Sequence, residues 1–412
     1  MSTEGLESSD VRRFRLKARE WLQANVPRLE RADDGACLPP DRDEPEKTRI
    51  DFARQTQAQL FEAGYAGITY PVEYGGAGLS LDHERAYLEE SADYNVPTQV
   101  FAVSLNILGK TLLKYGSAQQ KLHHLPRMLR GDEIWLQLLS EPSGGSDLAG
   151  LVTRANRDGD VYILNGQKTW STGADSADFA MCPARTSWDV PKHKGISMFI
   201  VDLQLPGIEV RPIKQINSES DFCEEFLTDV VVPSDCLIGD ENEGWRVVRG
   251  LLEIEHEWVG RTGGVYMPRT DVDDLVALLK QRGLDKDSGA RRQVAAIFTL
   301  QAAQRALAIR VGQAIADGHL TPAHGGLLKL GNDTLRQRRS ETTLTLAGSS
   351  GITWEPAAFG HECTAIYLRA RSASIAGGTA EIQRNNVSER ALGLPREPDA
   401  DRDRPFSEVP RN

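Results

Sequence analysis

The sequence lacks the features that mark several common classes of protein. We find no apolar run of the ~20 residues that cross a bilayer, so we expect no membrane span. The N-terminal stretch MSTEGLESSDVRRFR has no apolar core of a secretory signal. These absences together favour a cytoplasmic protein.

Cysteine is also scarce, and acidic residues outnumber basic ones. The five cysteines are scattered and show no CxxC spacing, which argues against a disulfide framework or a zinc site. The histidines show no HExxH spacing, and surface or capping roles suit them, so we expect no bound metal. Lys and Arg number 48 against 59 Asp and Glu, and the net charge of −11 argues against nucleic-acid binding.

The 412 residues suffice for about two or three domains. Helical periodicity predominates in residues 1–133, short strand patterns in 134–240, and helical periodicity again in 241–396, before a polar and mobile tail at 397–412. Local signals include an N-cap at Ser9 or Asp10, a capping box at Ser117 and Gln120, and a hairpin signal at Asn165-Gly166. We therefore predict an α+β protein with an α–β–α order.

Three stretches have compositions that suit ligand binding, but each also has an ordinary interpretation. LLSEPSGGSDLAG (138–150) offers hydroxyls and exposed backbone N–H groups, or is a polar turn. LNGQKTWSTGADSADF (164–179) offers an aromatic face beside hydroxyls, although a tryptophan in a strand is more often part of a core. ASIAGGTAEIQR (373–384) places two glycines before a helix, where they form an anion site or a simple cap.

Taken together and in order, these stretches resemble signatures of the acyl-CoA dehydrogenase family of flavoproteins. The matching segments are PVEYGGAGLS (71–80), SEPSGGSDLAGLVTRA (140–155), NGQKTWSTGA (165–174) and GGTAEIQRN (377–385). The resemblance extends over about residues 10–396. It implies an N-terminal helical domain, a middle β-barrel or sandwich and a C-terminal four-helix bundle.

The resemblance also implies FAD between the β domain and the bundle. The residues that match the family's FAD contacts fall into three groups: Gln137, Leu139, Ser140, Gly145 and Ser146; Trp170, Ser171 and Thr172; and Thr379 with Glu381. Gly348 and Gly351 resemble a turn that contacts FAD from a neighbouring subunit, and Arg291 falls where another such contact is expected. Ser146 is also expected near the thioester arm of the substrate.

The family's reaction removes a proton from Cα of an acyl-CoA and a hydride from Cβ, which yields a trans-2-enoyl-CoA. Many members carry the base where this chain has Gly377, whose backbone N–H can still hold the thioester oxygen. Isovaleryl- and long-chain acyl-CoA dehydrogenases place a glutamate on an earlier helix instead. The matching residue is Glu255, with Glu253 as the competitor if the register is shifted. His256 replaces a common arginine, which alters a predicted substrate contact.

The resemblance implies an oxidoreductase of lipid β-oxidation that passes electrons to an electron-transferring flavoprotein. It also implies a tetramer, built from this chain alone or with a sister subunit. Two alternatives remain. In the first alternative, the chain is a flavin oxidase or monooxygenase of the same fold. In the second, it is a non-catalytic partner subunit, because Gly377 has no side chain that could act as the base.

Overall fold

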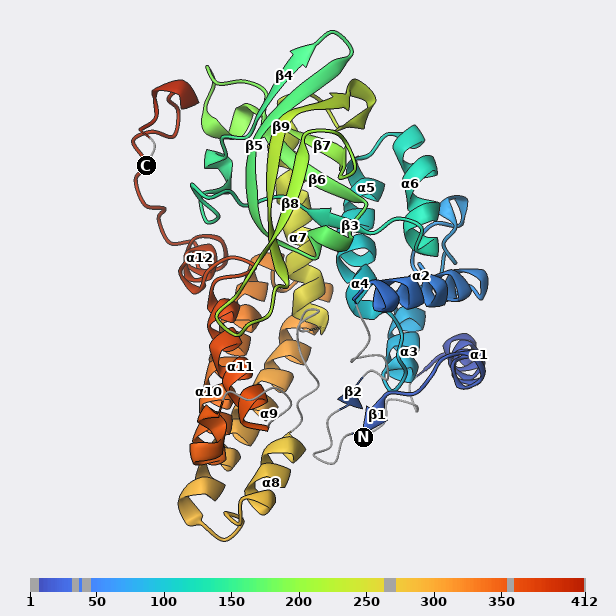
Figure 1. Ribbon diagram of the computed structural model, residues 1–412, viewed down its shortest axis with the longest axis vertical. Helices are drawn as coiled ribbons and strands as arrows, with labels where there is room; N and C mark the ends of the chain where they lie inside the picture. Colours follow the sequence, from blue (N-terminus) through green and yellow to red (C-terminus); the bar gives the residue numbers. More distant parts are fainter. Residues whose placement is uncertain (1–6, 32–36, 39–45, 263–271, 354–358, 411–412) are drawn as a thin grey trace.

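The computed structural model describes residues 7–31, 37–38, 46–262, 272–353 and 359–410 (Figure 1). Helices form the first part of the chain, strands the middle and helices most of the remainder. The predicted α+β class and α–β–α order are therefore confirmed. Strand β3 begins at Trp135 and helix α7 at Gly244, close to the domain boundaries predicted at 133 and 240, which themselves stay predictions.

The N-terminal segment packs its helices around leucine and tyrosine side chains that include Leu22, Leu60 and Tyr87. Its elements are α1 (Ser9–Asn25), β1 (Glu30–Arg31), β2 (Cys37–Leu38), α2 (Glu46–Glu62), α3 (Leu81–Ser91), α4 (Thr98–Val103), α5 (Gly109–Tyr115) and α6 (Ala118–Arg130). A π-helical stretch, Ser104–Leu108, joins α4 to α5. The capping box at Ser117 and Gln120 is confirmed. The N-cap of α1 is Ser8, whose hydroxyl accepts from Val11 N, so the expected Ser9 or Asp10 was wrong.

The middle segment is one mixed sheet ordered β10-β7-β6-β4-β5-β9-β8, with β3 beside β6 in parallel. Its strands are β3 (Trp135–Gln137), β4 (Arg154–Asp158), β5 (Val161–Thr172), β6 (Phe179–Arg185), β7 (Ile196–Asp202), β8 (Ile208–Ile213), β9 (Phe222–Pro233) and β10 (Leu237–Ile238). Buried side chains such as Tyr162, Phe199 and Val230 fill its interior. The same cluster includes Ala53 of α2 and Phe101 of α4, so the sheet shares this core with the N-terminal helices.

The hairpin expected at Asn165-Gly166 does not exist, because both residues lie inside β5. The turn between β4 and β5 lies instead beyond the paired residues Asp158 and Val161. A Cβ at Gly166 would lie 2.3 Å from Thr153 Oγ1, so this glycine permits a close approach within the sheet. Strand β5 pairs with β9 on both sides of a register shift between Leu164 and Gly166, and this pairing outweighs the local turn signal.

The C-terminal bundle contains α7 (Gly244–Thr262), α8 (Val272–Gln281), α9 (Ser288–Ala316), α10 (Gly325–Ala347), α11 (Phe359–Arg369) and α12 (Ala380–Asn386). Helix α7 passes behind the sheet and enters the bundle (Figure 1). Its buried side chains Val247, Val248 and Leu251 share a core cluster with Met181 and Met198 of the sheet. This packing fixes α7 relative to β3, β6 and β7.

By length and composition alone, Ser288–Ile315 of α9 could cross a membrane, which corrects the expectation that no run is long enough. Only 17% of the apolar window is buried in the described structure. The core helix of a soluble protein meets the same criteria, so one such helix is weak evidence for a membrane span.

The polar tail was expected to be mobile, but its described part docks on the sheet segment. Phe406 is 2% exposed, and its ring lies 3.7 Å from the guanidinium carbon of Arg185. Its backbone N–H donates to Val190 O at 2.9 Å. One aromatic residue among polar neighbours therefore anchors the tail.

Candidate active site

Glu255 lies on α7, one turn beyond the buried Leu251, and is partly buried. A Cβ added to Gly377 would lie 3.9 Å from Glu255 Oε1. Gln137, at the end of β3, donates from Nε2 to Glu255 Oε2 at 3.3 Å. The structure thus brings together three predicted site residues from the sheet, α7 and the turn before α12.

The turn at Gly377 and Gly378 has φ values of 64° and 82°, which glycine adopts without a Cβ penalty. Gln383 of α12 donates to Gly377 O at 2.9 Å, and its Nε2 lies 3.4 Å from His256 Nε2. Thr379 caps α12 by accepting from Ile382 N at 3.2 Å. The backbone beside Glu255 is therefore held from both α7 and α12.

Lys329, which sequence reasoning missed, also reaches this site. Its Cε would lie 3.8 Å from a Cβ on Gly377, and its ammonium donates to Asp333 at 2.6 Å and to Ala373 O. It stands in LLKLGND of α10, which resembles an ordinary amphipathic helix and gives no functional signal. Gln383 was likewise missed, although it lies inside the GGTAEIQRN signature.

Glu253 faces a different direction from Glu255, because two residues along a helix are about 200° apart. It is exposed, and its carboxylate lies 3.9 Å from Lys114 and 3.8 Å from Arg249. The geometry therefore places Glu255, and not Glu253, beside Gly377.

The second group of predicted residues surrounds the β5 end and the loop after β3. Trp170 is 59% exposed and adopts φ 66°, which is unusual for a residue other than glycine. Thr169 N donates to Ser140 O at 3.0 Å, so the loop is attached to the strand. Gly145 and Ser146 are exposed, Leu139, Ser140 and Thr172 are partly buried, and Ser171 is buried.

A buried ion pair contacts this second group of residues, since Lys168 Nζ donates to Leu139 O at 3.5 Å. Lys168 Nζ lies 2.8 Å from Glu141 Oε1, and the two side chains are 0% and 1% exposed. Glu141 also accepts from Val152 N at 2.7 Å and Thr153 N at 3.0 Å. Burial would raise the pKa of Glu141, but the Lys168 ammonium and these hydrogen bonds hold it below its usual value.

Arg291, Gly348 and Gly351 lie apart from this site within one chain. Arg291 is exposed at the start of α9 and donates to Asp285 O at 3.0 Å. Gly348 and Gly351 follow α10, where Arg282 at the end of α8 donates to Ser350 at 2.8 Å. Figure 1 shows α8 at the end of the bundle away from the sheet. Glu381 is exposed on α12 and lies 3.5 Å from Arg384.

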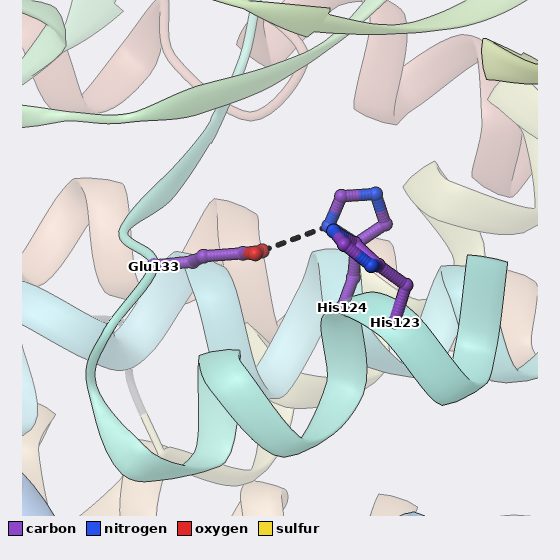
Figure 2. Close-up of side chains that lie close together, drawn as sticks. All are labelled: His123, His124 and Glu133. Atoms are coloured by element: carbon purple, nitrogen blue, oxygen red, sulfur yellow. Dashed lines mark hydrogen bonds and ion pairs between the residues drawn. The ribbon is translucent and has the colours of Figure 1, made fainter.

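His123, His124 and Glu133 form a separate cluster whose candidate ligand atoms lie within 4.8 Å of one another (Figure 2). His124 Nδ1 lies 2.9 Å from Glu133 Oε2, which also accepts from Trp135 Nε1 at 2.8 Å. These partners already satisfy the buried carboxylate. The cluster is therefore explained as a polar junction between α6 and β3.

The comparisons with known proteins agree over nearly the whole chain. Models of the acyl-CoA dehydrogenase N-terminal, middle and C-terminal domains match residues 8–132, 137–230 and 242–392. Acyl-CoA dehydrogenase IpdE1 of Mycolicibacterium smegmatis is 34% identical over 402 residues, covering 94% of this chain and 99% of the relative.

Solved structures show the same architecture. A structure titled "Tcur3481-Tcur3483 steroid ACAD" is 28% identical with a TM-score of 0.78, and the match covers 95% of this chain and 99% of that one. A glutaryl-CoA dehydrogenase from Mycobacterium smegmatis in complex with FADH2 is 22% identical with a TM-score of 0.68, covering 95% and 97%. The chain belongs to the acyl-CoA dehydrogenase family, whose members are flavin-dependent oxidoreductases of lipid β-oxidation.

Proposed function

We propose that the protein desaturates an acyl-CoA thioester between Cα and Cβ, with Glu255 as the base. The approach of Glu255 Oε1 to Gly377 carries this proposal. The Cα proton goes to Glu255, the Cβ hydrogen leaves with its electron pair, and a trans double bond forms. This carboxylate beside the vacant side-chain position argues against the non-catalytic alternative.

The residues around Trp170 fit a flavin. The indole is exposed in a strained backbone conformation, the loop through Gly145 and Ser146 presents backbone N–H groups, and buried Gln137 Oε1 has no hydrogen-bond partner among the described residues. FAD, when bound, supplies the hydride acceptor. We propose that Gln137, Leu139, Ser140, Gly145, Ser146, Trp170, Ser171, Thr172, Thr379 and Glu381 hold it.

The two oxygens of Glu255 have separate tasks in this proposal. Gln137 holds Oε2, which leaves Oε1 on the side of Gly377 to receive the proton. The Gly377 N–H donates to the thioester oxygen as negative charge develops there. Gln383 keeps the peptide in place by binding Gly377 O, and His256 contacts the substrate beside it.

We propose a bulky, ring-containing acyl group as the substrate. The support is the similarity to the structure titled a steroid acyl-CoA dehydrogenase. Straight-chain and simple branched acyl groups are the competing classes.

The exposed apolar side of α9 supports assembly into a tetramer. Phe298 is 61% exposed and Ile309 56%. A second copy or a sister subunit that covers α9 would remove this surface from water. Arg291, Gly348 and Gly351 would then contact FAD of a neighbouring subunit. We propose an electron-transferring flavoprotein as the acceptor.

The experiment that tests this function starts from the purified full-length chain. We expect bound yellow flavin, which steroid-side-chain CoA thioesters bleach without oxygen faster than straight-chain or branched thioesters do. A colourless chain that becomes active only with a co-expressed sister subunit would favour the partner alternative. Rapid reoxidation by oxygen with product bound would favour the oxidase alternative.

A further inference from the structure

Glu225 is a fully buried carboxyl group that contacts Ser171, one of the residues that we propose hold FAD. It lies on β9 directly opposite Lys168 of β5, and both residues are 0% exposed. One carboxyl oxygen bonds to the hydroxyl of Ser171. The other, Oε2, is buried and has no hydrogen-bond partner in the described part of the chain. An acid with an unsatisfied buried oxygen is costly, so its presence calls for an explanation.

Lys168 does not neutralise Glu225, because its three N–H donors are already in use. They point to Glu141 Oε1 at 2.8 Å, Pro183 O at 2.9 Å and Leu139 O at 3.5 Å. An ionised Glu225 would therefore be a buried charge without a hydrogen-bonded cation. Burial, opposed by the Ser171 hydrogen bond, raises the pKa of Glu225 to about 7.

A bulge connects Glu225 to the exposed tryptophan. The pairing of β5 with β9 shifts between Thr169 and Ser171, so Trp170 is the extra residue. Without this shift, Trp170 would take the inward position two residues after Lys168. With it, Ser171 turns inward to Glu225, and Trp170 is exposed. The Ser171–Glu225 bond therefore fixes the inner side of the bulge.

We propose that Glu225 is a positioning residue that couples its own protonation to FAD binding through the Ser171–Trp170 bulge and Lys168. This inference rests on the proposed FAD site. Ionised Glu225 attracts the Lys168 ammonium, which then moves away from the carbonyl oxygen of Leu139, a proposed FAD contact. Deprotonation also converts the carboxyl group that bonds to the Ser171 hydroxyl from a neutral to a charged group. Both effects displace residues that we propose hold FAD, so FAD binds more weakly as pH rises through the neutral range.

Glu141, Cys182 and Cys223 do not titrate in that range. Glu141 remains ionised because Lys168 and hydrogen bonds offset its burial and lower its pKa, whereas burial raises the thiol pKa of Cys182 and of Cys223 to about 11. Glu224, the next residue on β9, raises the pKa of Glu225 through its charge. On β8 the residue opposite Glu225 is the apolar Val210.

The test measures the FAD dissociation constant of the flavin-stripped full-length chain at about pH 6 and pH 8. We expect wild type to bind at least about fivefold more weakly at the higher pH, the low end of typical coupling between linked sites. Glu225→Gln keeps the shape and the Ser171 bond but has no proton to lose, so its affinity should change less than twofold. Glu225→Leu gives the same comparison if the glutamine variant does not fold.

Glu209→Gln is the matched control, since Glu209 is an exposed glutamate on the neighbouring strand β8 that pairs with Arg211 at 2.7 Å and is not among the groups that shift the pKa of Glu225. It should retain the wild-type pH dependence. Equal wild-type affinity at both pH values, or an equal change in Glu225→Gln, would overturn the coupling and leave the proposed function intact. Absence of FAD binding by wild type at every pH would overturn both.

Discussion

Glu255 and Gly377 come from opposite ends of the C-terminal segment, yet a Cβ on Gly377 would lie 3.9 Å from Glu255 Oε1. Gly377 lies in a turn with φ 64°, a conformation that glycine adopts without a Cβ penalty. Because that turn carries no side chain, an acid from the neighbouring helix can reach the same space. A carboxylate attached at position 255 or at position 377 can therefore reach the same space.

Gln383 should matter for turnover more than for stability. Its amide bonds Gly377 O at 2.9 Å, so Gln383→Ala releases the peptide that we assign to the thioester oxygen. Small misplacements of catalytic groups can cost up to ~10²-fold in rate, and we expect a fall in kcat that approaches this value. Steady-state kinetics will measure it. Arg384→Ala, which changes an exposed side chain on the same helix, is the control, and an equal loss in both variants would contradict the assignment.

The buried Lys168–Glu141 pair should contribute strongly to stability when only one partner is removed. Lys168→Met leaves Glu141 as a buried unpaired charge, which typically costs about 3–5 kcal/mol. The double variant Lys168→Met/Glu141→Gln should recover much of that loss. Urea unfolding will measure both free energies. Arg211→Met breaks an exposed pair with Glu209 and should leave the free energy of unfolding nearly unchanged, because water screens the two charges. Additive losses in the double variant would refute this account.

Glu225 should make the free energy of unfolding depend on pH. Its pKa is raised from 4.5 to about 7 in the folded chain, so the folded state holds the proton more tightly. The associated stability is fully present below pH 4.5 and is lost as pH rises to about 7. The shift corresponds to on the order of 3 kcal/mol. Wild type minus Glu225→Gln, measured by urea unfolding across this range, should show the loss. A constant difference would exclude it.

The order of helices and strands could be predicted because periodicity and capping act locally. Ser117 and Gln120 formed their capping box as expected. Asn165-Gly166 did not form a hairpin, because pairing of β5 with β9 continues through it. Phe406 docks although its neighbours are polar, since one apolar ring against Arg185 suffices.

The site could be predicted only where the resemblance to the family assigned a role to a residue. Glu255 and Gln137 belonged to segments that resemble the family, and Gln137 Nε2 lies 3.3 Å from Glu255 Oε2 in the structure. Lys329 and Glu225 carried no signal, because a lysine on an amphipathic helix and a glutamate in a strand resemble solvated side chains. Their burial follows from distant strands and helices, which no local pattern records.

The most direct test of the account is flavin bleaching by a CoA thioester substrate under anaerobic conditions, compared between Glu255→Gln and Glu253→Gln. Both variants replace a glutamate on α7, but Glu253 is exposed. We predict that Glu255→Gln slows bleaching at least ~10²-fold, as loss of a general base does, and that Glu253→Gln leaves it near the wild-type rate. Wild-type bleaching by Glu255→Gln would contradict the central claim.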